Sequence, residues 1–582
     1  MQHLKDPRQI HLFDPWECFF PEATYAKLRH SWQGLFHTVL LELMPAQELA
    51  EHFHPEMGRP TKELYSMAGL VFLMAFNDWT CEEAVLAYCF RLDVQYALNV
   101  APKDAELSLR TLERYLQLFR EMDAAQAVFD SVTEALIAHL ELDVSRQRLD
   151  STHVFSNMAL YGRTALMVQA LRRLLRQVRR HRRAHYEDLP ETLRERYDPQ
   201  GPSSPFGLSR GKNTAEQRRL ERQQVAEDMH LVLKTFDGVD GIATMDTYKQ
   251  LLRVFAEHCE VHEDATVVVR PKSDSRALQS LTDPDATYDG HKGRGYQAQI
   301  TETCSDNNEV QLITDVVPQT AADSDSAALP EVVSRLEESG RAPEELLADT
   351  AYGSDENVQY CAAHGTELIS PVKNRHEGNE DALTAVDFDM DHETKTVTRC
   401  PAGHRPCSAS YSPARNEGYA LFDRATCQAC PLAKRCLTYA YQKKYRRLRY
   451  TDKTLRLEAR RRAQQTSAFK ERYRKRSGIE GTNSALKRAR GFGKLRVRGR
   501  PAVAMAIYLK AAGHNLLQAA RCLRMRHRTT PKPTQPRQNA LFANIFSPAA
   551  HPKSLQRLAS ALRCPFMLPT RMPRPLVAQA SS

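Results

Sequence analysis

The stretch YRKRSGIEGTNSALK, Tyr473 to Lys487, decides the fold of this chain. Spacings of three, four and seven residues separate four of its polar side chains: Tyr473, Arg476, Glu480 and Lys487. At about 100° per residue, one continuous helix would place all four on the same side, within roughly 60° of each other. A hydroxyl, a guanidinium, a carboxylate and an ammonium form a poor packing surface. The pattern instead favours a surface that binds phosphate beside a metal ligand.

The pattern Tyr-x2-Arg-x3-Glu-x6-Lys resembles the signature of bacterial insertion-sequence transposases of the DDE type. In that family the Glu is the third of three metal-binding carboxylates, and the catalytic core is ribonuclease H-like. The resemblance therefore implies an α/β fold, with a mixed sheet flanked by helices. It also implies two upstream Asp residues at strand ends.

Asp150 and Asp349 are the candidates for these two residues. Asp150 lies near the end of a strand predicted at 144–154, and Asp349 ends the apolar run LLADT at 346–350. The context LLADTAYGS resembles the second motif of the family. The resemblance implies that Asp150 bridges two Mg²⁺ or Mn²⁺ ions, while Asp349 and Glu480 each complete one site. The alternative is that each Asp only caps a turn after its strand.

The remaining periodicities suggest how the chain is divided. Further strands are predicted at 265–271, 295–303, 310–317 and 367–372, and helices at 214–236, 326–339 and 354–364. Three parts are predicted: a helical domain at 1–145, a ribonuclease H-like domain at 146–515, and a basic, disordered tail at 516–582. Two insertions interrupt the ribonuclease H-like domain, a basic helical one at 155–262 and a cysteine-rich one at 373–440.

The N-terminal domain is predicted to consist of short helices. Thr61 is a candidate cap for the first, Thr80 with Glu83 forms a capping box for the second, and Ser108 starts a third. Short helices joined by tight turns suit a DNA-binding module. Oligomerisation or simple packing is the alternative.

Charge favours DNA as the partner. Residues 441–540 contain 29 Lys or Arg and four acids, a net charge of +25, whereas the whole chain carries +10. Such a basic segment on an acidic body is typical of a polyanion binder, although a solvated basic tail would look similar. The phosphate-binding candidates are Tyr473, Arg476 and Lys487, followed by Arg488, Arg490 and Lys494 in a Gly-rich loop. An ion-pair network with Glu480 is the alternative for the first three.

Five of the 13 cysteines lie between residues 400 and 436. Three of them form the pattern C-x2-C-x5-C, and a cytosolic chain disfavours disulfides, so a tetrahedral structural zinc is predicted. Transposases with a similar cysteine-rich insertion match at Cys400, Cys427, Cys430 and Cys436, with Cys407 and His404 as substitutes. The alternative is a group of ordinary thiols.

Location and activity follow from these features. No run of 18 apolar residues exists and the N-terminus lacks the apolar core of a signal peptide, so we expect a cytoplasmic, nucleoid-associated protein without a membrane partner. The resemblance implies cleavage and strand transfer at the terminal inverted repeats of an insertion sequence, with a homodimer holding two ends of double-stranded DNA. The alternatives are a metal-dependent nuclease without strand transfer and a non-catalytic DNA-binding derivative.

Overall fold

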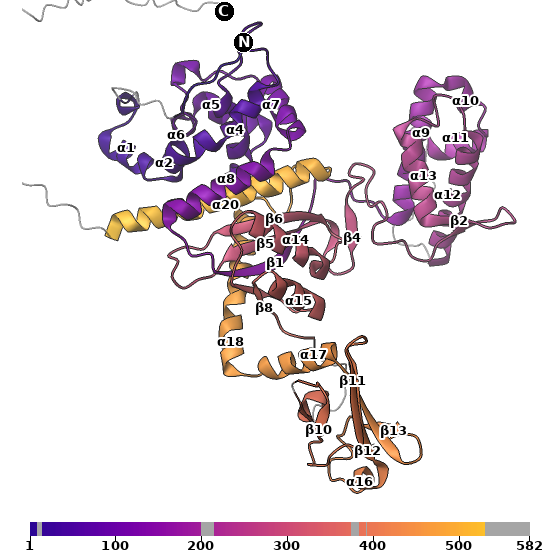
Figure 1. Cartoon of the computed structure of the whole chain (residues 1–582). Coiled ribbons are helices and arrows are strands. Elements are labelled where there is room, and N and C mark those ends of the chain that lie inside the picture. Colours follow the sequence, from indigo (N-terminus) through magenta and orange to yellow (C-terminus); the bar gives the residue numbers. More distant parts are fainter. Residues whose placement is uncertain (8–13, 15, 199–214, 374–382, 392, 530–582) are drawn as a thin grey trace, which may run out of the picture. The chain divides into compact units, whose positions relative to one another are not determined.

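A computed structural model describes the chain except for residues 8–13, 15, 199–214, 374–382, 392 and 530–582 (Figure 1). The chain divides into two compact units, Met1–Met525 and Arg526–Ser582, and the second lies almost wholly outside the described residues. Helix α20, Arg500–Thr529, continues past residue 516. The predicted start of a disordered tail at that residue is therefore wrong, and the rest of the predicted tail lies outside the described residues.

The N-terminal part is helical, as predicted. Its α-helices are α1 Glu22–Arg29, α2 Trp32–Leu35, α3 Ala46–Ala50, α4 Leu64–Asn77, α5 Cys81–Phe90, α6 Leu92–Ala97, α7 Leu109–Glu121 and α8 Ala125–Leu140. The capping box of Thr80 and Glu83 is confirmed at α5, and Ser108 caps α7. Thr61 does not cap α4, because the Glu63 carboxylate accepts hydrogen bonds from the Tyr65 and Ser66 amides instead.

One hydrophobic core joins these helices to the central sheet and to α20, and its members include Phe72, Phe129, Ile300 and Leu516. Helices α8 and α20 lie against each other, with the Phe129 and Tyr508 rings 6.1 Å apart (Figure 1). The hydrophobic core therefore continues across the domain boundary predicted at residue 145.

The central sheet is mixed and has six strands. They are β1 Arg146–Val154, β4 Thr287–Asp289, β5 Gly293–Thr303, β6 Ile313–Thr320, β7 Glu345–Ala348 and β8 Glu367–Ile369. The order is β4-β5-β1-β7-β8, with β6 also paired to β5. Strands β1, β7 and β8 are parallel, whereas β5 is antiparallel to β1 and to β6. The prediction of a mixed sheet flanked by helices is confirmed.

Helices cover both faces of this sheet. Leu149 and Leu346 pack with α14, Asp325–Glu338, and with α15, Asp355–Ala363. On β1 and β5, Val154 and Ile300 belong instead to the core that contains α20. Because successive residues of a strand point to opposite faces, Leu149 and Asp150 face different layers.

The helical insertion after β1 has a core of its own. It contains α9 Arg163–His181, α10 Arg183–Glu187, α11 Glu191–Tyr197, α12 Ala215–Thr235 and α13 Asp246–His258. Strands β2, Cys259–Val261, and β3, Val267–Val269, form a two-stranded antiparallel sheet. Val267 and Leu281 belong to this core, so the insertion extends beyond the predicted end at residue 262.

The cysteine-rich insertion is also larger than predicted. Its four-stranded sheet has the order β11-β12-β14-β13, with β11 Ser408–Ser412, β12 Glu417–Asp423, β13 Tyr439–Tyr441 and β14 Tyr445–Thr451. It also contains β9 Asp389–Met390, β10 Val397–Arg399 and α16 Arg424–Gln428. The insertion thus runs to residue 451 rather than 440. Helices α17 Asp452–Ala463 and α18 Ser467–Arg474 follow it.

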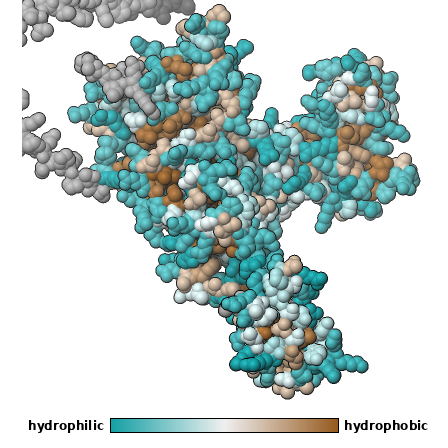
Figure 2. Space-filling view, in the orientation of Figure 1, coloured by the Kyte–Doolittle hydropathy of each residue, from teal (hydrophilic) through white to brown (hydrophobic). Residues whose placement is uncertain are grey.

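Hydrophilic residues cover most of the face drawn in Figure 2. Of the helices described, none is long and apolar enough to cross a membrane.

Candidate catalytic site

The segment from Tyr473 to Lys487 is not one continuous α-helix. Helix α18 ends at Arg474, a 3₁₀ turn spans Lys475–Gly478, and α19 begins at Ile479 and ends at Ala489. The prediction of a single helix is therefore wrong: the four signature side chains lie on three consecutive elements.

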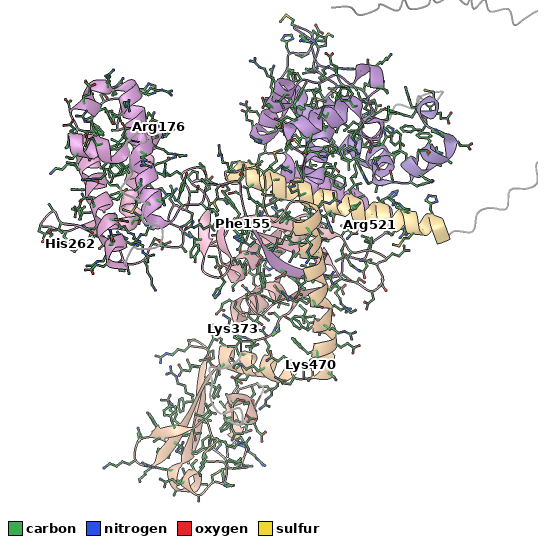
Figure 3. The ribbon with its side chains drawn as sticks, turned by 180° about the vertical axis from the view of Figure 1, so that it is seen from behind. Phe155, Arg176, His262, Lys373, Lys470 and Arg521 are labelled. Atoms are coloured by element: carbon green, nitrogen blue, oxygen red, sulfur yellow. The ribbon has the colours of Figure 1, made fainter. Side chains whose placement is uncertain are left out.

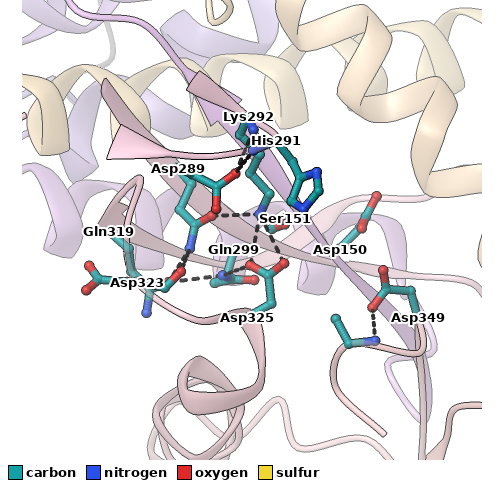
Figure 4. Close-up of polar contacts among 12 residues, drawn as sticks. Asp150, Ser151, Asp289, His291, Lys292, Gln299, Gln319, Asp323, Asp325 and Asp349 are labelled. Atoms are coloured by element: carbon teal, nitrogen blue, oxygen red, sulfur yellow. Dashed lines mark hydrogen bonds and ion pairs between the residues drawn. The ribbon is translucent and has the colours of Figure 1, made fainter. Parts of the chain in front are cut away.

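Asp150 and Asp349 lie side by side where the pairing of β1 with β7 ends (Figure 4). Asp349 directly follows β7, as predicted, whereas Asp150 lies in the middle of β1 and pairs with Ile300 of β5, so the prediction that it lies near the end of its strand is wrong. The last residues paired between the parallel strands β1 and β7 are Leu149 and Ala348, and each Asp is the next residue of its chain. Burial raises the pKa of Asp150, and the charge of Asp349 raises it further, while Arg476 opposes the shift. The site therefore places two carboxylates close enough to repel each other.

Arg476 links Asp150 to Glu480. Its Nη2 donates to Asp150 Oδ1 at 3.0 Å, and its Nη1 lies 3.5 Å from Glu480 Oε1. The Asp150 side chain is 16% exposed and that of Glu480 is 69% exposed. Asn483, on α19, donates to the other Asp150 oxygen at 3.2 Å. The Arg476 Nε–H is buried and has no hydrogen-bond partner among the described residues.

Tyr473 and Lys487 lie within electrostatic reach of the same carboxylates. Tyr473 stacks on Phe469, with 5.8 Å between the ring centroids. Burial raises its pKa, and the charges of Asp349 and Asp150 add to the shift while Arg476 opposes it. Burial lowers the pKa of Lys487, and Asp150 opposes that shift. The signature side chains therefore gather around the two Asp residues although their helix is broken.

A buried ion pair beneath the signature segment was not foreseen from the sequence. Arg148, on β1, lies 2.6 Å from a Glu302 carboxylate oxygen, and their side chains are 12% and 1% exposed. Arg148 Nη1 donates to the Lys475 carbonyl at 2.9 Å, and Thr482 Oγ1 donates to Glu302 at 2.6 Å. The pair therefore connects β1 and β5 to the 3₁₀ turn and to α19.

Gly478 is required by this arrangement. A Cβ atom at this position would lie 1.9 Å from Arg148 Nη1, whereas nothing lies within 4 Å of a Cβ at Gly481. We expect Gly478→Ala to lower the free energy of unfolding by about 1–3 kcal/mol, because the bound guanidinium must move. Gly481→Ala is the control and should raise the free energy of unfolding by up to about 1 kcal/mol, since Ala favours a helix more than Gly does. Urea denaturation measures both, and equal effects would contradict the packing argument.

A polar network lies beside the two Asp residues (Figure 4). The Lys292 ammonium is 3.0 Å from Asp325 and donates to Ser151 Oγ at 2.8 Å. Gln299 donates to Asp325 at 3.1 Å and accepts a hydrogen bond from the Tyr352 hydroxyl. Ser151 directly follows Asp150, and Tyr352 is three residues after Asp349. The network therefore fixes the two chain segments that carry the carboxylates.

The basic loop after α19 divides into two kinds of residue. Arg488 and Lys494 are exposed. Arg490 instead lies over the Phe76 ring at 4.2 Å and donates to the Phe76 carbonyl, and burial lowers its pKa to about 10. Arg490 thus packs against the N-terminal helices, unlike the phosphate-binding role predicted for it.

The cysteine-rich insertion contains a small pocket. Four cysteines line it together with His404: Cys400, Cys427, Cys430 and Cys436. Burial raises the pKa of Cys427, and the other three thiols add to the shift, so each of the three lies within electrostatic reach of Cys427. Cys407 is exposed and does not line the pocket.

Neither set of residues is arranged as a finished metal site. Within the part of the chain that the structure describes, no group of three or more His, Cys, Asp or Glu side chains is placed to hold a metal ion. At the carboxylates, the Arg476 guanidinium lies between Asp150 and Glu480 and supplies the local positive charge.

Comparisons with known proteins agree with part of this description. The family model of the transposase DDE domain matches residues 399–520, which contain Glu480 but neither Asp150 nor Asp349. No curated protein sequence matches the chain. A cryo-EM structure of a piggyBac transposase synaptic complex with hairpin DNA is 9% identical, covers 91% of this chain and 88% of its own, and has a TM-score of 0.28. A score this low does not establish a shared fold.

Proposed function

We propose that this chain is a DDE transposase of a bacterial insertion sequence, which cleaves DNA at the terminal inverted repeats and joins the freed ends to target DNA. The observation that carries the proposal is the adjacency of Asp150 and Asp349, with Arg476 linking Asp150 to Glu480. Glu480 lies in the segment that matches a transposase DDE domain. The mixed sheet flanked by helices supports the ribonuclease H-like core that the resemblance implies.

The donor set suits a hard divalent cation. Asp150, Asp349 and Glu480 offer carboxylate oxygens, which Mg²⁺ and Mn²⁺ prefer. The raised pKa of Asp150 reflects in part the repulsion by Asp349, which a cation would relieve. Two bound ions would activate the attacking water or 3′-hydroxyl and stabilise the leaving oxygen.

The other residues of the site would position the DNA. The buried Nε–H of Arg476 lacks a partner and would bind a phosphate oxygen once the side chain moves, and Lys487 offers a point charge. Tyr473 can donate its hydroxyl to a phosphate, while the exposed Arg488 and Lys494 would follow the DNA backbone. The N-terminal helices would bind the terminal repeat, and a homodimer on the nucleoid would hold two ends.

The direct test is a strand-transfer assay with a labelled duplex that carries the element's own end. The proposal expects cutting at that end and joining to a target plasmid with Mg²⁺ or Mn²⁺, and neither reaction in EDTA. Cutting without joining would support the alternative of a nuclease. Binding without cutting under any divalent metal would support a non-catalytic DNA-binding protein.

We also propose that the four cysteines of the pocket hold a structural zinc. A structural zinc is bound by four protein ligands, with its thiols deprotonated and no position left open. Four cysteine side chains line this pocket. We expect about one zinc per purified chain by elemental analysis. Cys430→Ser should lose the zinc and Cys407→Ser, its matched control, should retain it. Equal zinc contents in both variants would refute this assignment.

A further inference from the structure

We propose that the exposed side of α9 is a separate binding surface for the phosphate backbone of duplex DNA. This inference rests on the proposed function, because it gives the helical insertion a role in holding the transposase's DNA. Helix α9 contains six Arg and no Asp or Glu. Arg176, an exposed residue, is labelled where it stands on this helix in Figure 3.

The charge of α9 is confined to one side. Its apolar residues, among them Leu171, Leu174 and Val178, are buried in the core of the insertion. A shallow hollow on the other side is lined by Arg173, Arg176, Gln177, Arg179, Arg180 and His181. Because its apolar side is already occupied, α9 cannot insert that side into a membrane surface. The basic side alone is available to a partner.

Packing and local pairing do not account for this side of the helix. Arg176 and Arg180 are four residues apart on this side, and like charges at this spacing destabilise a helix. The helix dipole favours cations only in the last turn, and Arg173 and Arg176 precede it. An anionic partner would remove the repulsion.

The charges also lack strong partners of their own. Arg179 lies 3.9 Å from Asp198, in an exposed pair. Arg173 donates to the Leu281 carbonyl, which leaves its charge uncompensated. Among the described residues, no carboxylate pairs with Arg176 or Arg180. These two guanidinium groups are therefore free to bind phosphate bidentately.

The dimensions of the surface suit a duplex. At 1.5 Å per residue, Arg173 to Arg180 spans about 10 Å along the helix axis. A DNA strand carries one phosphate per roughly 3.4 Å of duplex axis, so this side of α9 can reach two or three phosphates. No base-reading group is needed, and the contact would be independent of DNA sequence.

The test compares two double variants that each remove two positive charges. Arg176→Gln/Arg180→Gln changes the proposed surface. Arg183→Gln/Arg253→Gln is the control in the same insertion, where each Arg already pairs with a Glu four residues later. Binding of a duplex of unrelated sequence is measured in EDTA as a function of salt concentration.

We expect the first variant to bind about tenfold more weakly near 0.15 M salt, with the slope of log K against log salt reduced by about 2. The control should stay within about twofold of wild type. Equal effects in both variants, or an effect on duplex RNA and not on DNA, would overturn the role of α9. End cleavage at low salt, measured for wild type and both variants, tests the proposed function separately. If wild type does not cleave either, the proposed transposase activity is refuted, and not only the role of α9.

Discussion

Asp150→Asn is expected to reduce DNA end cleavage by about a thousandfold or more, while the protein still folds and binds DNA. Asn keeps the shape of the side chain and removes the charge that would hold the metal ions. Several kcal/mol of transition-state stabilisation are assigned to such ions, and about 4 kcal/mol corresponds to a thousandfold change in rate. Cleavage of the labelled element end, followed in single-turnover assays with Mg²⁺, measures the effect.

The structure explains why this substitution should not unfold the protein. Burial raises the pKa of Asp150, so removing its charge relieves a cost of desolvation. Asn483 Oδ1 is buried without a hydrogen-bond partner and can accept from the new amide if the Asn483 side chain turns over. Arg476 keeps Glu480 as a neighbour at 3.5 Å. We expect the free energy of unfolding to change by less than about 1 kcal/mol.

Asp306→Asn is the matched control. Asp306 pairs with Lys475 of the same 3₁₀ turn, but its side chain is 79% exposed. Its removal should leave cleavage within about twofold of wild type, since exposed ion pairs contribute little. Retained cleavage in Asp150→Asn would remove this residue from the site. A loss matched by weaker folding or weaker DNA binding would assign it a structural role instead.

The candidate site residues could be selected from local sequence, because their spacing and context are local. The apolar run LLADT predicts Asp349 at a strand end, and Asp349 directly follows β7. The strand predicted at 144–154 puts Asp150 near its end, whereas Asp150 lies in the middle of β1, beside the point where the pairing with β7 ends. The capping box at Thr80 was found for the same reason, since its two partners are three residues apart. The catalytic roles of the carboxylates stay predictions.

The shape of the signature segment could not be predicted, because distant residues determine it. Helical periodicity predicted one helix, yet the Arg148 guanidinium lies against Gly478 and binds the carbonyl of Lys475, more than 300 residues later in the chain. Arg490 shows the same limit: its charge suggested phosphate binding, while tertiary contacts place it over Phe76. Local propensity is a weak guide wherever such contacts compete with it.

Arg148→Met is expected to lower the free energy of unfolding by about 3–5 kcal/mol, because it leaves the Glu302 carboxylate buried and unpaired. The Glu302 side chain is only 1% exposed, and Thr482 would be its only remaining hydrogen-bond donor among those described. The same substitution removes the hydrogen bond from Arg148 to the Lys475 carbonyl in the 3₁₀ turn. Since α19 follows this turn and carries Glu480, its position becomes less fixed and cleavage should fall. Urea denaturation and the cleavage assay measure the two effects.

The loss should depend on pH in a definite direction. Burial raises the pKa of Glu302 in the folded protein, and Arg148 opposes that shift. Without Arg148 the folded pKa rises further above the unfolded value, so the folded state binds the proton more tightly. Stability of the variant is then greatest below the ordinary pKa of Glu and falls as the pH rises through the raised one. The deficit relative to wild type should be larger at pH 8 than at pH 5.

The double variant Arg148→Met/Glu302→Leu separates the effect of the unpaired Glu302 charge from the effect of losing the hydrogen bond to the Lys475 carbonyl. Replacing both partners by apolar side chains removes the uncompensated charge, so most of the lost stability should return and the added pH dependence should disappear. Cleavage should stay low, because no side chain then ties β1 to the Lys475 carbonyl and Thr482 has lost its acceptor. Full recovery of cleavage together with stability would show that the ion pair supports the fold alone and does not position Glu480.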